Sequence, residues 1–138
     1  MTSSYVLAID VALAVCSERA GSSAEGLYPA ALGSRGWEAM VEVGEASARV
    51  GNTSDARRAY LVAFDRAHAV DSVEGTLRAA AALAVLGDSE AVGQMVRVAE
   101  HLAIRHQVPP AERARVRAEG AALVAQASVA RQTGSSVR

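Results

Sequence analysis

The sequence predicts an all-α fold, an antiparallel array of helix hairpins with about six to seven helices. Two observations predict it. A glycine followed by polar residues interrupts the chain at Gly51 and again at Gly87, 36 residues later, and small or branched residues follow both breaks at matching offsets. A period of this size is typical of stacked helix pairs. In addition, 51% of the 138 residues are hydrophobic but only 4% are aromatic, which favours closely packed helices over a sheet sandwich. No segment has a convincing strand pattern.

A chain of this length normally forms one domain, which we expect over residues 1–132. Its first section, residues 3–33, is predicted to hold irregular N-terminal helices. Apolar residues at helical spacing indicate a helix from Ser3 or Ser4 to about Arg19. A shorter helix over 24–32 is interrupted by Pro29, which lacks a backbone donor.

The next two predicted helices cover residues 37–50 and 53–69. Gly44 lies inside the first, where a glycine costs about 1 kcal/mol relative to alanine, so we expect the backbone of another helix to pass close by. The second is the most amphipathic segment of the chain, with apolar residues on one face and charged residues on the other. The list of its apolar face is Ala56, Ala59, Tyr60, Ala63, Phe64 and Ala67.

Three further helices complete the prediction. Asp71 is expected to cap a helix that ends at Leu86, with Glu74 completing a capping box; because this helix is apolar nearly all round, we expect it to be buried on most sides. A helix follows from Asp88 to about Gln107. Pro110 is suited to the first turn of a last helix, which is predicted over 110–131 as a cap, and residues 133–138 are predicted to form a flexible tail.

The hairpin over residues 37–70 resembles a tetratricopeptide repeat. It has that family's length and much of its pattern, in Gly44, the Gly51-Asn52 turn, Ala56, Tyr60 and Ala63. A second unit over 73–106 resembles it through Ala80, Leu83, Leu86, Gly87-Asp88, Val92, Val96 and Ala99. Three features depart from the family: Trp37 falls a turn early, no proline closes either unit, and Val96 replaces an aromatic residue.

The resemblance implies a fragment of a right-handed α-solenoid whose concave groove binds a peptide. Two good repeats are fewer than the three that such arrays usually need. The flanking helices are therefore expected to act as caps, or a second copy completes the array. A homodimer is slightly favoured because it would cover the apolar helix over 73–85, whereas Arg113, Arg115 and Glu119 could give the last helix the polar outer face of a cap.

Charge and cysteine content restrict the expected partners and the expected cellular compartment. The net charge is −1, but residues 101–138 hold six arginines against two acids. The arginines at 113, 115 and 117 are expected to fan around their helix, and no aromatic residue accompanies them, which disfavours nucleic acid. Cys16, the single cysteine, excludes an internal disulfide, and we expect a cytoplasmic protein with no membrane partner. Leu13-Ala14-Val15-Cys16 only loosely resembles a lipoprotein box, since it lacks a basic start.

No catalytic, cofactor-binding or metal site is predicted. His101 and His106 are five residues apart and do not share a helix face, and no ligand accompanies them at metal-binding spacing. Phosphate-binding glycine loops and hydrolase motifs are also missing from the sequence.

A partner-binding face is predicted on the first helix of each repeat. Its residues are Glu38, Val41, Glu42, Glu45, Arg49 and Arg78. The acidic ones could line the peptide groove that the family implies. The alternative is a solvated face with one Glu45–Arg49 ion pair worth about 0.3–0.5 kcal/mol. The family's lysine-dependent clamp for carboxy-terminal peptides is unsupported, because the chain has no lysine.

These observations favour a non-catalytic protein–protein interaction or scaffold module that binds a partner protein or peptide. Two other classes stay open. One is a regulatory helical-repeat domain associated with a bacterial transcription regulator, suggested by the long helix ending near Gln107. The other, ranked last, is a small enzyme of unknown chemistry.

Overall fold

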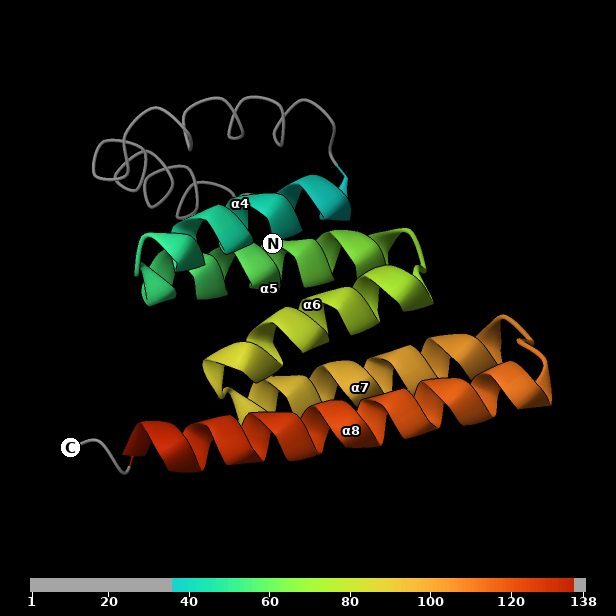
Figure 1. The fold of residues 1–138 in the computed structure, drawn as a ribbon. Coiled ribbons are helices and arrows are strands. Elements are labelled where there is room, and N and C mark those ends of the chain that lie inside the picture. The colour runs from blue at the N-terminus through green and yellow to red at the C-terminus, as the bar shows by residue number, and fades with distance from the viewer. Residues whose placement is uncertain (1–35, 136–138) are drawn as a thin grey trace. The chain divides into compact units, whose positions relative to one another are not determined.

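The computed structural model describes residues 36–135, which form five α-helices and no strand (Figure 1). Their bounds are α4 Trp37–Arg49, α5 Thr53–Ala69, α6 Val73–Leu86, α7 Ser89–Arg105 and α8 Pro110–Ser135. The chain divides into two compact units, Met1–Arg66 and Ala67–Arg138, with the boundary inside α5. The all-α prediction is confirmed for the described residues. They contain five helices, whereas six to seven were expected for the whole chain. The helices predicted over 3–19 and 24–32, and the Cys16 segment, lie outside this part.

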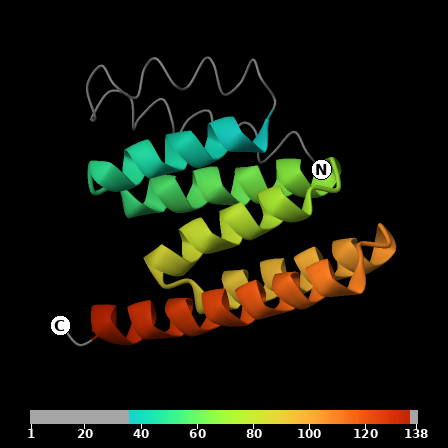
Figure 2. The same ribbon diagram turned by 45° about the vertical axis from the view of Figure 1, so that its right-hand side comes forward.

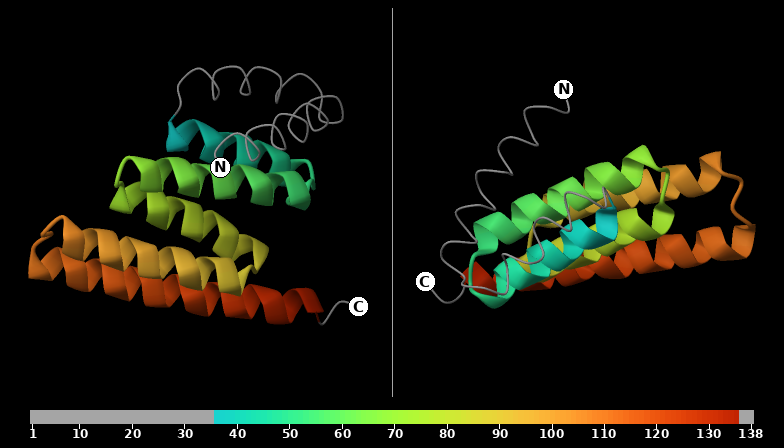
Figure 3. Two further views of the ribbon diagram at one scale, coloured as in Figure 1. Left: turned by 180° about the vertical axis from the view of Figure 1, so that it is seen from behind. Right: turned by 90° about the horizontal axis from the view of Figure 1, so that it is seen from above.

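In the first unit, α4 and α5 form an antiparallel hairpin (Figure 3). Two contacts show the register. Arg66 Nη1 donates a hydrogen bond to the Gly36 carbonyl oxygen at 3.3 Å, and the Tyr60 ring covers Gly44, where a Cβ atom would overlap it. Gly44 therefore has a close neighbour, but it is the Tyr60 ring and not the helix backbone that the sequence predicted. Tyr60 is only 4% exposed and belongs to the core of this hairpin.

The turn at Gly51 follows from backbone chemistry. Its φ of 80° lies in the left-handed region, which costs a side-chain-bearing residue roughly 1 kcal/mol or more. The Gly51 and Asn52 amides donate to the carbonyl oxygens of Ala48 and Ser47 at 3.0 and 2.9 Å. These bonds satisfy two carbonyls that the end of α4 leaves without partners. Gly87 repeats this conformation with a φ of 79°, so both predicted breaks are confirmed as helix ends.

The start of α6 differs from the prediction. Ser72, not Asp71, caps the helix: its Oγ accepts a hydrogen bond from the Gly75 amide at 2.9 Å. Asp71 instead has a φ of 54°, and its carboxylate lies 3.3 Å from Nε2 of His106, at the far end of α7. At the start of α7, Asp88 is the cap, since its Oδ1 accepts from the Ala91 amide at 3.2 Å.

In the second unit, α6, α7 and α8 all pack against one another, and α8 runs antiparallel alongside α7 (Figure 2). Val96 on α7 lies against Gly120, where a Cβ atom would overlap it, and Arg131 near the end of α8 donates to the Ser89 hydroxyl at 3.4 Å. The buried residues of α8 are few and mostly small: Gly120, Leu123 and Ala127. The capping role of the last helix and the homodimer both stay predictions.

One expectation about extent is wrong. The last helix continues to Ser135, so 133–135 are not part of a flexible tail, and residues 136–138 lie outside the described part. The helix expected from Asp88 to about Gln107 is α7, which ends at Arg105. Half of the residues of α6, which was expected to be buried on most sides, are buried, although Val85 is 67% exposed. None of the described helices is long and apolar enough to cross a bilayer.

Candidate functional site

The predicted partner-binding residues are divided between the units. Glu38, Glu42, Glu45 and Arg49 are exposed along α4 of the first unit. Val41 is only 3% exposed, so its side chain belongs to the core and is not available to a partner. Arg78 is exposed on α6 of the second unit.

The charged side chains of Glu45 and Arg49, in the C-terminal part of α4, act electrostatically on the Tyr60 hydroxyl. Burial raises the pKa of the Tyr60 hydroxyl above its ordinary value, the Glu45 carboxylate raises it further, and the Arg49 guanidinium opposes both. The neutral phenol is therefore the form that this hairpin stabilises. No general base follows from this arrangement, because a raised phenol pKa makes the hydroxyl harder to ionise.

Two hollows described in the second unit lie on different sides of the first half of α8. The larger, with a cavity volume of about 440 Å³, lies between α6 and α8 and is called the α6–α8 groove. Its lining residues are Val73, Glu74, Leu77, Arg78, Val108, Glu112, Val116 and Glu119. Four are apolar, three are carboxylates and one is a guanidinium, so the groove combines an apolar surface with net negative charge.

Local folding explains why these residues meet. The Ser72 cap begins α6 one residue before Val73, and the first two turns then place 73, 74, 77 and 78 on one side of the helix at i, i+1, i+4 and i+5. Pro110 begins α8, where its fixed φ and missing donor suit the first helical turn. Positions 112, 116 and 119 follow at i, i+4 and i+7, which again is one helix face.

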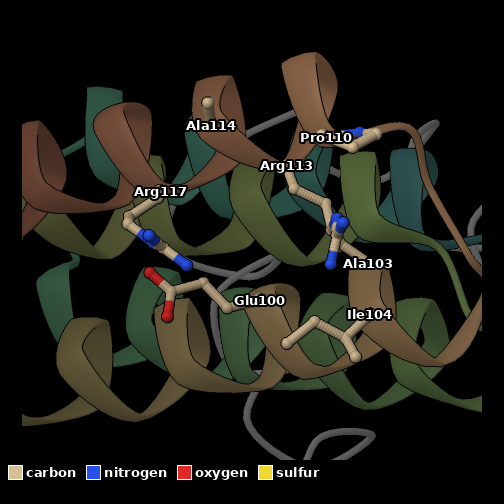
Figure 4. Close-up of a pocket in the computed structure, with 7 residues that line it drawn as sticks. All are labelled: Glu100, Ala103, Ile104, Pro110, Arg113, Ala114 and Arg117. Atoms are coloured by element: carbon tan, nitrogen blue, oxygen red, sulfur yellow. The ribbon is translucent and has the colours of Figure 1, made fainter.

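The smaller hollow has a cavity volume of about 250 Å³ and lies between α7 and α8; it is called the α7–α8 pocket. Its lining residues are Glu100, Ala103, Ile104, Pro110, Arg113, Ala114 and Arg117 (Figure 4). The side chains of Glu100 and Arg117 point toward one another, whereas Arg113 extends toward Ala103 on α7 (Figure 4). The Nε atom of Arg113 is buried and has no hydrogen-bond partner.

The pocket corrects the expectation for the arginines of α8. Arg113 and Arg117 share one face, and Arg115, between them, is exposed and does not line the pocket. Their i, i+4 spacing is a helical signal that the alternating 113, 115, 117 pattern concealed. No pattern in the sequence indicated that α7 would provide Glu100 and an apolar wall opposite them.

Metal chemistry finds no support within residues 36–135, where no group of three or more His, Cys, Asp and Glu side chains could hold an ion. His106 contacts Asp71, which joins the two ends of the α6–α7 hairpin. The comparisons with known proteins do not extend this picture: no family model matches the chain, and neither a curated protein nor a solved structure matches it.

Proposed function

We propose that this protein is a non-catalytic interaction module and that the α6–α8 groove binds a segment of a partner protein. One observation carries the proposal: an open hollow of about 440 Å³ presents Val73, Val108 and Val116 beside carboxylates from two helices. Binding sites commonly combine an apolar surface with a few polar groups that fix orientation. Arg78, which the sequence predicted for partner binding, also lines this groove.

The charges of the groove specify the chemistry of the partner. Glu74 and Arg78 are four residues apart on α6, a spacing that favours mutual neutralisation. Glu112 and Glu119 line the groove from α8, and no arginine of α8 lines it with them. A segment with an apolar side chain flanked by lysine or arginine would therefore match both the apolar surface and the excess of negative charge. The tetratricopeptide-like hairpin pattern supports the same proposal, since such arrays bind peptides in a groove.

A peptide selection on the full chain tests this proposal. Phage-displayed peptides selected on the wild type should share an apolar residue flanked by basic ones. Val116→Asp places a charge in the groove and should weaken these peptides roughly 30-fold, the effect of losing about 2 kcal/mol at a binding hot spot. Val129→Asp is the matched control, because Val129 lies on the same helix, is 59% exposed and is outside the groove lining.

Circular dichroism should first show that both variants keep the helical content of the wild type. Equal binding of the selected peptides to the two variants would contradict the proposal. So would a selection that yields no specific peptide or only acidic ones. Glu112→Gln combined with Glu119→Gln provides a milder test, because it keeps the size of both side chains and should reduce affinity mainly at low salt.

A further inference from the structure

We propose that the α7–α8 pocket is a second binding site, which accepts a single carboxylate carried on a short apolar stem. The site is separate from the α6–α8 groove, and its lining residues are on a different face of α8. The inference depends on four features: the position of Arg113, the state of its Nε atom, the charge balance of the pocket and its size.

Of the two arginines in the pocket, Arg113 is the one that does not face the Glu100 carboxylate. Its guanidinium extends toward α7, while the Glu100 carboxylate points toward Arg117 (Figure 4). A guanidinium carries five N–H donors and accepts nothing. Because the Nε atom is buried without an acceptor, one of these donors has lost water and gained no partner within the described residues. Folded proteins contain few such groups, and each indicates a missing acceptor or a functional role.

A carboxylate in the pocket can pair with the terminal N–H groups of Arg113, whereas the buried Nε atom is out of its reach. Two oxygens in one plane match two parallel N–H groups of an arginine, and this bidentate pairing is stronger than a bond between neutral groups. Part of the guanidinium is already desolvated in the empty pocket, which reduces the further desolvation that binding requires.

Charge and size restrict the anion further. Two arginines and one glutamate give the lining a formal charge of +1, which balances one carboxylate and leaves a dianionic phosphate uncompensated. Ala103, Ile104 and Ala114 provide apolar wall, and Ile104 is 56% exposed when the pocket is empty. The cavity volume of about 250 Å³ is below the range of roughly 300–1,000 Å³ typical for drug-sized ligands. The stem is therefore a short chain or a single apolar side chain.

Two sources share this chemistry, a small aliphatic acid and the carboxyl end of a peptide. Titrations of the ¹⁵N-labelled full chain with hexanoate and with acetyl-Ala-Leu separate them, and the Arg Nε–Hε signals provide the readout. The signal of Arg113 should shift and saturate with at least one of the two probes. Hexanol and acetyl-Ala-Leu amide, which lack the carboxylate, should leave that signal in place, and inorganic phosphate should bind more weakly than the better carboxylate.

Variants of three pocket or control residues decide between a specific site and general attraction. Arg113→Met should lose at least tenfold in affinity, whereas Arg115→Met, the control on the same helix, should stay within twofold of the wild type. Glu100→Gln removes the negative charge from the lining and should tighten binding by about two- to fivefold, the range of a partly exposed charge interaction. The backbone amide spectrum can verify that the Glu100→Gln variant keeps its helical fold.

Several results would overturn the proposal. One is a non-saturating shift with both carboxylates, and another is equal loss in Arg113→Met and Arg115→Met. Hexanol acting as strongly as hexanoate would show an apolar site without anion recognition. Tighter binding of phosphate than of either carboxylate would assign the pocket to a different ligand class. Peptide binding in the α6–α8 groove is measured by different variants, so failure of either proposal leaves the other testable.

Discussion

The two hairpins that resemble one another in sequence place their small residues differently. In the first, Gly44 on α4 lies beneath the Tyr60 ring on α5. At the same offsets, 36 residues later, the second hairpin has Ala80 on α6 and Val96 on α7. Both are buried, so a methyl group and a branched side chain replace the empty position and the ring.

The glycine that the second hairpin contacts lies outside the hairpin, on α8. Val96 lies against Gly120 of α8, which has no side chain at the point of contact. In the first hairpin, the Tyr60 ring packs on a glycine within its own helix pair. In the second hairpin, the shorter Val96 side chain is combined with an alanine on α6 and contacts a glycine of the next helix instead. Similar repeat patterns thus predict the same helix pairing but not the same close contacts, because the contact depends on the size of both residues.

The largest effect is expected from Gly44→Ala. Alanine improves helix propensity by about 1 kcal/mol, but its Cβ atom would overlap the Tyr60 ring. Overpacking a core typically costs about 1–3 kcal/mol, and displacing a ring that is 4% exposed adds lost burial. We expect a net loss of about 2 kcal/mol in the free energy of unfolding. Urea denaturation followed by fluorescence of Trp37, the single tryptophan, reports on this unit.

A second-site variant tests the cause of that loss. Tyr60→Val gives the first hairpin the residue found at the matching position of the second. In that background Gly44→Ala recreates the Ala80 and Val96 combination, so the alanine should stabilise the hairpin and the sign of its effect should reverse. If Gly44→Ala destabilised both backgrounds equally, the ring would not be the reason.

Gly120→Ala should have a smaller effect. Its Cβ atom would overlap a Val96 methyl group, and a β-branched residue in a helix has little rotamer freedom to move away. However, α8 buries only three residues, so it can shift outward more easily than the enclosed hairpin. Against the gain of about 1 kcal/mol in helix propensity, we expect a net loss below about 1 kcal/mol. Far-UV circular dichroism should detect it, while the Trp37 fluorescence transition should stay unchanged.

Local patterns predicted the features that depend on neighbours in the chain. The glycine breaks at Gly51 and Gly87 and the helix start near Asp88 all follow from residues within one or two turns. The Asp71 cap was wrong because the aspartate adopts a left-handed conformation and contacts His106, 35 residues away in sequence. With Asp71 held there, Ser72 is the next polar side chain that can reach the orphan amides of α6.

The candidate sites were less predictable for the same reason. Val41 shares its helix face with three glutamates in the sequence, but it lies at the edge of that face and is turned into the core. The α6–α8 groove contains one predicted residue, Arg78, and its other members come from segments whose meeting depends on how α8 packs. The pairing of Arg113 with Arg117 could be found from spacing, but the buried Nε atom becomes apparent only when α7 is present.

The smallest effect is expected at alkaline pH and returns to Tyr60, the residue that distinguishes the first hairpin. Burial, and then the Glu45 carboxylate, raise the pKa of its hydroxyl in the folded state, against the opposing charge of Arg49. Because the folded pKa is above the unfolded value of about 10, the stabilisation is complete below pH 10 and is lost as the pH rises through the folded pKa.

Tyr60→Phe has no ionisable hydroxyl, so the difference in unfolding free energy between wild type and variant should be constant from pH 7 to 9. It should then move in favour of the variant as the pH rises above about 10. The chain has no lysine and three tyrosines, so few other groups titrate in this range. Glu45→Gln should weaken the pH dependence by removing one of its causes. The second hairpin has Val96 at the position of Tyr60, so it contributes no tyrosine titration to the measurement. If the unfolding free energies of the wild type and Tyr60→Phe stayed parallel up to pH 11, the hydroxyl would ionise equally well in the folded and unfolded states.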